Sequence, residues 1–206
     1  MFGDVARVVP RHRRPALAAL AAAASLVAGA PPASATPPRL PNLLTNGGFE
    51  HPRVAAGSSH PFASIPGWHL AFGPDIELQN HVAGEPAAGS QFAELDSDRS
   101  SGIFQRVRTE PGRLYRLQLF ASARPGTSAA ENVLVVKWHR RVVARITLDG
   151  RGLAHTDWHA YAFKLRATGR RARLELDDAG ISDSVGTYVD AVKVTFWRGH
   201  PTAQPR

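Results

Sequence analysis

The stretch Asn42-Leu-Leu-Thr-Asn-Gly-Gly-Phe-Glu50 decides the fold that we expect for this chain. It places apolar residues beside a glycine turn, followed by an aromatic side chain and a carboxylate. An answering stretch lies near the other end, Gly186-Thr-Tyr-Val-Asp190-Ala-Val-Lys-Val194. If the two stretches pair in one sheet, Glu50 and Asp190 can approach each other, and adjacent carboxylates need a cation between them. This pairing predicts a β-sandwich whose two ends are joined by a structural metal.

Short apolar segments separated by turn residues fill the chain between these stretches, and helical periodicity is hard to find. A period of two, with Gly, Pro, Asp and Ser between the segments, is typical of strands in an antiparallel sheet. Segments this short predict an all-β fold, an antiparallel β-sandwich or jelly roll. The expected strands are residues 91–96, 103–107, 113–120, 132–138, 141–148, 158–165, 171–176 and 185–196.

The first 35 residues are predicted to be a signal peptide. Four arginines precede an alanine- and leucine-rich run at residues 16–30, and residues 33–35 offer a small-residue cleavage site. The alternative is a membrane anchor, but the run is shorter than the roughly 20 residues that span a bilayer. We therefore expect a signal peptide at 1–35, a proline-rich leader at 36–41, a β-sandwich domain at 42–197 and a flexible tail at 198–206.

The composition indicates a secreted chain without disulfides and argues against nucleic-acid binding. The chain has no cysteine, so no disulfide can stabilise it outside the cell, and a bound metal is a candidate stabiliser. Cleavage of the signal peptide lowers the net charge from +8 to +5. The remaining arginines are scattered, with tight clusters only at residues 140–141 and 170–173, and none alternate with stacking aromatics. We interpret the positive charge as a solvated face or as attraction to anionic wall polymers.

A set of short motifs also occurs in a fixed order along the predicted domain. The motifs are residues 42–50, Ile65-Pro-Gly-Trp68, Ile76-Glu77, Glu94-Leu-Asp-Ser97, Gly102-Ile-Phe-Gln105, Pro111-Gly112 before Tyr115, Phe120-Ala-Ser-Ala-Arg-Pro125, Trp138, Trp158 and residues 186–194. This ordered set resembles the secreted, galactose-binding-domain-like β-sandwich proteins of domain of unknown function 642, found in plant cell walls and in bacteria. More distantly, it is similar to calcium-containing carbohydrate-binding modules with a jelly-roll fold.

One turn departs from the family pattern. Members of the family usually have an aspartate-glycine-like turn after the tryptophan that matches Trp138, whereas this chain has His139-Arg140-Arg141. Arginine reaches positive φ less easily than glycine, so we expect this hairpin to differ in turn type or length.

The resemblance implies a calcium ion held by Glu50 and Asp190, and the residues themselves agree with it. Calcium takes six to eight oxygen ligands, and these combine carboxylates with backbone carbonyls. Gly47 and Gly48 would let the backbone turn its carbonyls inward, so we include Gly48 in the expected metal site. The alternative is that Glu50 caps a turn and Asp190 is an ordinary surface acid.

Two further groups have residue types that bind metals, but simpler explanations exist. Asp177, Asp178 and Asp183 form a second acidic group, which we interpret as solvated turn residues. His155 and His159 have the spacing of two zinc ligands on a helix. Their segment, however, has the pattern of a loop entering a strand, and no third ligand stands out.

Sugar binding requires an aromatic platform and polar groups that orient hydroxyls. Trp68 follows a Pro-Gly turn and has acids nearby, so we expect it to be the platform. The alternative is that Trp68 fills the core, because tryptophans are highly buried on average. The expected ligand-binding residues are Trp68, Asp75, Glu77, Glu94, Asp96 and Arg124.

Catalysis has little support in the sequence, which lacks a G-x-S-x-G elbow, H-E-x-x-H, a phosphate loop and a cysteine nucleophile. Glu94 and Asp96 are about 7 Å apart if they share one strand face. This separation overlaps that of glycosidase acids, but such pairs flank a cleft, so an exposed polar face that accepts sugar hydroxyls fits better. We predict a secreted, non-catalytic module that binds cell-wall or extracellular polysaccharide and holds a structural calcium. The alternative is an adhesion protein that binds protein partners at the cell wall, and a glycosidase ranks third.

Overall fold

The computed structural model describes residues 40–197. The predicted signal peptide, most of the predicted leader and the 198–206 tail lie outside the described residues. The described part of the chain contains twelve strands and no helix, so it holds no helix that is long and apolar enough to cross a membrane.

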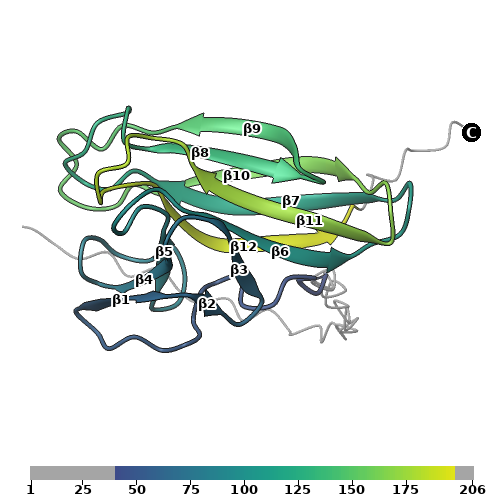
Figure 1. Ribbon diagram of the computed structural model, residues 1–206, viewed down its shortest axis with the longest axis horizontal. Coiled ribbons are helices and arrows are strands. Elements are labelled where there is room, and N and C mark those ends of the chain that lie inside the picture. Colours follow the sequence, from purple (N-terminus) through teal and green to yellow (C-terminus); the bar gives the residue numbers. More distant parts are fainter. Residues whose placement is uncertain (1–39, 198–206) are drawn as a thin grey trace, which may run out of the picture. The chain divides into compact units, whose positions relative to one another are not determined.

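Two antiparallel sheets of six strands each form a β-sandwich (Figure 1). Sheet A has the order β1-β4-β5-β12-β7-β10, and sheet B has the order β2-β3-β6-β11-β8-β9. The expected all-β antiparallel sandwich is confirmed. The strands are β1 (Ser58–Phe62), β2 (Ser64–Ile65), β3 (Trp68–Phe72), β4 (Ile76–Asn80), β5 (Phe92–Glu94), β6 (Gly102–Arg108), β7 (Leu114–Ser122), β8 (Val133–Trp138), β9 (Arg141–Thr147), β10 (His159–Arg166), β11 (Arg171–Asp178) and β12 (Tyr188–Phe196).

All eight expected strands are present, but sequence reasoning missed β1 to β4. Strand β1 lies at the edge of sheet A and contains Pro61, and β2 has two residues at the edge of sheet B. Edge strands tolerate proline and bury little of either face, so their residues show weak alternation of apolar and polar types. This explains why the periodicity of the sequence did not reveal β1 and β2.

The core lies between the inner faces of the two sheets. Alternate residues of the central strands point into it, for example Leu117 and Leu119 of β7 and Leu174 and Leu176 of β11, all of which are buried. Burial of each such side chain contributes on the order of 1.5–3 kcal/mol. The buried apolar side chains at alternate positions of these strands therefore hold the two sheets together. They are the positions that the period-two pattern of the sequence marks.

The two end stretches pair with each other, but residues 42–50 do not form a regular strand. The Asn42 side chain accepts a hydrogen bond from Val194 N (2.9 Å) and donates one to Val192 O (2.9 Å), so it replaces part of a backbone ladder. Gly47 O accepts a hydrogen bond from Val192 N (2.7 Å). A Cβ on Gly47 would lie 2.1 Å from Val192 O, so this close approach requires glycine.

Candidate functional site

Trp68 belongs to the core, so its predicted role as a sugar platform is wrong. It is 0% exposed and stacks on Phe49, with ring centroids 5.4 Å apart. Its indole N–H donates to Asn46 O at 3.0 Å, which satisfies the one polar group of the side chain. Trp68 therefore anchors the 42–50 stretch to the core and offers no surface to a ligand.

Glu94 forms a buried ion pair with Arg124 on the outer side of sheet A. Its carboxylate oxygens lie 2.8 and 2.9 Å from Arg124 Nη1, and they also accept hydrogen bonds from Gly186 N and Gln79 Nε2. Glu77 lies directly opposite Glu94 on β4. Burial raises the pKa of Glu94 above its usual value, although the charge of Arg124 and its hydrogen bonds oppose the shift. The ion pair joins two predicted ligand residues, but Glu94 is only 1% exposed, so the expectation of an exposed face is wrong.

Residues 81–90 explain why this face is buried. Phe92 and Tyr188 point away from the core, yet neither is exposed. The Tyr188 hydroxyl donates to Ala83 O at 3.4 Å, and Trp158 Nε1 donates to Glu85 O at 2.8 Å. We call residues 81–90 the covering segment, because they lie over the outer face of sheet A around β5 and β12.

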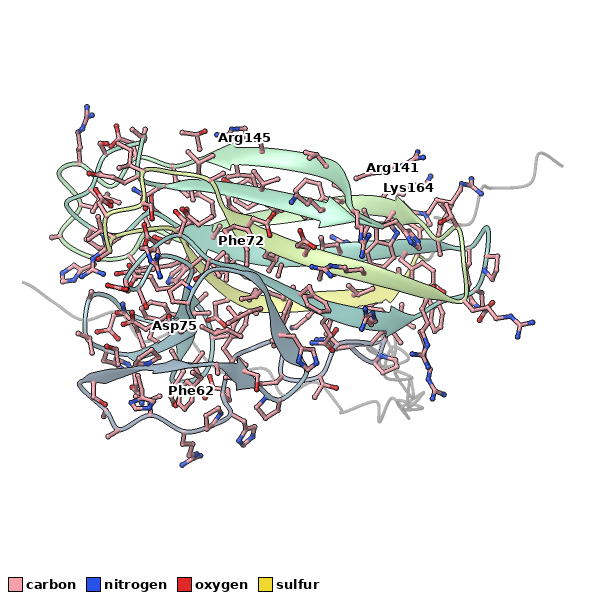
Figure 2. The ribbon with its side chains drawn as sticks, in the orientation of Figure 1. Phe62, Phe72, Asp75, Arg141, Arg145 and Lys164 are labelled. Carbon is pink, nitrogen blue, oxygen red and sulfur yellow. The ribbon has the colours of Figure 1, made fainter. Side chains whose placement is uncertain are left out.

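The other two predicted ligand acids, Asp96 and Asp75, are also bound by groups of the protein. Asp96 is fully buried and accepts a hydrogen bond from Asp183 N at 3.1 Å, so its expected exposure is also wrong. Asp75 is half-buried and accepts a hydrogen bond from Ser97 Oγ at 2.5 Å. Figure 2 shows Asp75 in the region of β1 to β4, well away from Arg145 on β9. At least one oxygen of each acid is therefore occupied by a protein group.

Glu50 and Asp190 are close enough for the charge of Glu50 to raise the pKa of Asp190. Glu50 Oε1 accepts hydrogen bonds from Ser90 N (2.8 Å) and Gln91 N (3.2 Å). Asp190 is 0% exposed, and Oδ2 accepts a hydrogen bond from Ala88 N at 2.9 Å. Burial is the main reason why the pKa of Asp190 rises to about 7. Neither acid forms an ion pair within residues 40–197.

The backbone around these two acids is strained and closely packed. Phe49 and Ala191, each adjacent to one of the acids, adopt left-handed φ values of 57° and 49°. Non-glycine residues in this region are strained, and such strain gathers at functional sites. A Cβ on Gly89 would lie 2.0 Å from Glu50 Oε1, so only glycine lets the covering segment approach this carboxylate. The oxygen donors suit calcium, although water and carbonyl groups would have to complete its coordination.

Gly48 does not have the conformational role that we expected. The left-handed residues of the turn are Asn46 and Phe49, and neither Gly47 nor Gly48 has positive φ. A Cβ on Gly48 would meet only Glu50 Cγ, at 3.9 Å. Its place in the metal site therefore stays a prediction that depends on its carbonyl group.

The other two groups of candidate metal ligands differ in burial: the histidines are exposed, whereas Asp177 and Asp178 are buried. His155 and His159 are exposed, and β10 begins at His159, so they do not share a helix. The described residues contain no group of three or more acidic, histidine or cysteine side chains arranged for a metal. Asp177 and Asp178 lie at the end of β11 and are 4% and 3% exposed, so their interpretation as solvated turn acids is wrong.

The outer face of sheet B gathers arginines that lie far apart in the sequence. Arg173 of β11 is directly opposite Arg106 of β6, and Arg171 is opposite Arg108. The guanidinium carbon of Arg173 lies 3.6 Å from the ring centroid of Phe104, and that of Arg106 lies 5.4 Å from it. Sequence reasoning missed this surface, because the arginines meet only through the pairing of β6 with β11.

Two acids on this face hold the cations in position. Glu175 accepts hydrogen bonds from Arg173 Nε at 2.5 Å and Lys137 Nζ at 3.0 Å. Lys137 also forms an ion pair with Asp177. Burial alone would raise the pKa of Glu175, but the hydrogen bond from Lys137 and the charge of Arg173 outweigh it and lower the pKa. The side chains of Arg173 and Lys137 are therefore fixed before any ligand arrives.

Two adjoining hollows lie on this face. The first has a volume of about 320 Å³, the second has a volume of about 390 Å³, and both are lined by Arg140 and Arg173. Together they form what we call the cationic groove. It is lined by Ala71, Arg106, Lys137, His139, Arg140, Arg171, Ala172, Arg173 and Glu175.

A strained turn places Arg140 in the groove. Trp138 pairs with Arg141, so the β8–β9 hairpin has a two-residue turn in which His139 and Arg140 adopt φ values of 52° and 64°. Two positive φ values are the pattern of a type I′ turn, so the expected change in turn type or length is wrong. His139 Nε2 accepts a hydrogen bond from Thr168 N at 3.2 Å, which supports the turn. Left-handed backbone costs a non-glycine residue about 1–2 kcal/mol, and here it orients a charged side chain.

No protein-family model matches this chain, and no curated protein matches it. Among solved structures, it is similar to a family 16 carbohydrate-binding module at 19% identity, over 75% of this chain and 99% of that module, with a TM-score of 0.47. A family 61 module in complex with β-1,4-galactotriose is 13% identical, over 76% of this chain and 99% of that one, with a TM-score of 0.46. A family 35 module from Clostridium thermocellum is 17% identical, over 66% and 97%, with a TM-score of 0.44. At such identities, the candidate sites of this chain rest on their own geometry.

Proposed function

We propose that this chain is a secreted, non-catalytic module that binds acidic polysaccharide of a cell wall or extracellular matrix through the cationic groove. The observation that carries the proposal is the convergence of four arginines, from β6, β11 and the strained β8–β9 turn, around two adjoining hollows. Those arginines are Arg106, Arg140, Arg171 and Arg173.

The chemistry of the groove suits a polymer with repeated negative groups. A guanidinium group can donate two parallel hydrogen bonds to a carboxylate, sulfate or phosphate. Arg106, Arg140 and Arg171 form no ion pair within the described residues, so their charges are not neutralised by the protein. Two guanidinium groups lie against Phe104, so recognition depends on charge and hydrogen bonds more than on aromatic stacking.

The titratable groups of the groove support binding and give little support to catalysis. Burial and the charge of Arg141 lower the pKa of His139, so this imidazole is neutral at pH 7. Glu175 is held as a carboxylate between two cations. Neither group has the arrangement of a paired acid and base that hydrolysis of a glycosidic bond requires.

A structural calcium at Glu50 and Asp190 is also part of the proposal. The ion would join the 42–50 stretch to β12 and neutralise two acids that otherwise repel each other. Secretion, and membership of the family of domain of unknown function 642, belong to the same proposal and rest on the motifs of the sequence.

The binding proposal is tested with the secreted protein on polygalacturonate, with a neutral β-1,4-galactan as the comparison polymer. We expect R140A/R171A to weaken binding to polygalacturonate at least tenfold in isothermal titration calorimetry. The matched control is R116A/K164A, which removes two exposed cations from sheet A and should change affinity less than twofold. Equal binding of the neutral galactan, or equal binding of a DNA duplex at the same ionic strength, would contradict the proposal. Binding to wall proteins alone would support the adhesion function instead.

A further inference from the structure

A second pair of buried acids lies at one end of the sandwich, apart from Glu50 and Asp190. Asp96 follows β5, Asp178 is the last residue of β11, and Thr187 directly precedes β12. Their exposed fractions are 0%, 3% and 0%. This place joins strands of both sheets, because β5 and β12 belong to sheet A and β11 belongs to sheet B.

Each of these three residues has a buried oxygen without a hydrogen-bond partner. The atoms are Asp96 Oδ1, Asp178 Oδ1 and Thr187 Oγ1. The other oxygen of each acid is held by the protein. Asp96 Oδ2 accepts a hydrogen bond from Asp183 N (3.1 Å), and Asp178 Oδ2 accepts one from Ser100 Oγ (2.7 Å). Buried polar atoms in folded proteins nearly always have a hydrogen-bond partner, so three unpartnered oxygens together indicate a missing ligand.

Gly186 lets the backbone before β12 pack closely against these acids. A Cβ at this position would lie 2.6 Å from Asp96 Cβ and 3.5 Å from Asp178 Oδ1. Asp96 and the unpartnered oxygen of Asp178 therefore lie against the same residue. Within residues 40–197, neither acid forms an ion pair with a basic side chain.

We propose that Asp96, Asp178 and Thr187 bind a second divalent cation, with calcium as the ion that fits. All three supply hard oxygen atoms, and calcium accepts carboxylates and neutral oxygens in a flexible geometry. With two carboxylates, the site needs water or backbone carbonyls to complete its coordination, so its affinity is modest. The ion ties the end of β11 to β5 and β12, and so joins the two sheets.

The site is separate from the calcium site in the proposed function. Asp190 lies three positions beyond Thr187, which is about 10 Å along an extended strand. One ion cannot bind both Thr187 and Asp190 across that distance. The proposal can therefore fail while the first site stands, and the reverse is also true.

Protonation of Asp178 is the competing explanation for two buried acids without a cation between them. Burial raises the pKa of Asp178 to about 6, and the charge of Asp96 also raises it. A protonated Asp178 would donate a hydrogen bond and satisfy the site without a metal. Measurements at pH 8, above this pKa, separate the two explanations.

The test counts bound calcium by equilibrium dialysis at pH 8 with the full secreted protein, after treatment with EDTA. We expect two ions for the wild type, one for E50Q/D190N, one for D96N/D178N and none for the fourfold variant. D183N removes a neighbouring exposed acid and should retain both ions. A wild type that binds one ion, lost in E50Q/D190N and kept in D96N/D178N, overturns this proposal and leaves the first site intact.

T187V provides a second test that does not depend on a charge change. Valine has nearly the shape of threonine, so the fold should be kept. We expect T187V to weaken binding at the second site at least fivefold in the E50Q/D190N background. The same variant should leave the melting temperature in EDTA equal or higher, because it removes an unpartnered buried oxygen. Unchanged calcium affinity in T187V would exclude the hydroxyl group from the site and contradict the proposal.

Discussion

The outer faces of the two sheets carry similar residues and have different roles. On sheet A, the covering segment lies over Phe92 and Tyr188, and Arg124 is paired with a buried Glu94. On sheet B, the cationic groove is open, and its arginines outnumber its acids. An arginine–glutamate pair is structural where a loop buries it, whereas arginines that outnumber the acids beside them keep charges that the protein does not neutralise.

The largest expected effect tests the structural role of the pair on sheet A. E94A removes hydrogen-bond acceptors from Arg124 and Gly186, and we expect a loss of about 3 kcal/mol in the free energy of unfolding. The matched variant on sheet B is E175A. Its cationic partners are partly exposed, so it should cost about 1 kcal/mol. Urea denaturation measures both values, and equal losses would remove the distinction between the two faces.

The next prediction concerns the removal of calcium from Glu50 and Asp190, which should loosen the covering segment on sheet A. The covering segment donates hydrogen bonds to both proposed ligands, from Ala88 to Asp190 and from Ser90 to Glu50. EDTA should therefore increase hydrogen exchange in residues 81–90 and leave the cationic groove unchanged. Calcium at one hundred times its dissociation constant should add about 2.7 kcal/mol of stability at this site. The control variant is E50Q/D190N, in which calcium should no longer add stability at this site or slow hydrogen exchange in residues 81–90.

A further effect is expected when the pH changes. Burial raises the pKa of Asp190 from its usual 3.8 to about 7. Between about pH 4 and pH 7, the metal-free folded protein then binds a proton that the unfolded chain does not, so its stability falls as the pH rises. Calcium binds the carboxylate, so its stabilisation should grow from pH 5 to pH 8. Melting temperatures with EDTA and with calcium measure both slopes, and a calcium effect independent of pH would exclude Asp190 as a ligand.

The last prediction has the smallest expected change in stability. It separates the backbone strain at Arg140 from the role of its side chain in binding polysaccharide on sheet B. R140G places glycine at a left-handed position, so we expect the protein to gain about 1 kcal/mol. The same change removes a guanidinium group that lines both hollows, so affinity for polygalacturonate should fall severalfold. The control is R141G, in the first strand position after the turn, which should give no gain in stability. A more stable R140G with full affinity would mean that the strain has no role in binding.

Local patterns predicted the strands well and the exposure of single residues poorly. The alternation in residues 91–96 correctly placed Ala93 and Leu95 in the core. The same alternation suggested that Glu94 and Asp96 face solvent, which is wrong because other segments cover that side. Periodicity reports which face of a strand a residue occupies, but it does not report what lies over that face.

The class of fold could be read from the chain alone, and the motifs at its two ends predicted that these ends pair. Period-two alternation and turn residues are local properties, so they are visible without a structure. Four relations came from the folded structure: Trp68 is core, Gly47 must be glycine beside Val192, scattered arginines form a groove, and Asp96 and Asp178 both lie against Gly186. These relations depend on strand order and register, which bring together residues tens of positions apart and leave no local trace in the chain.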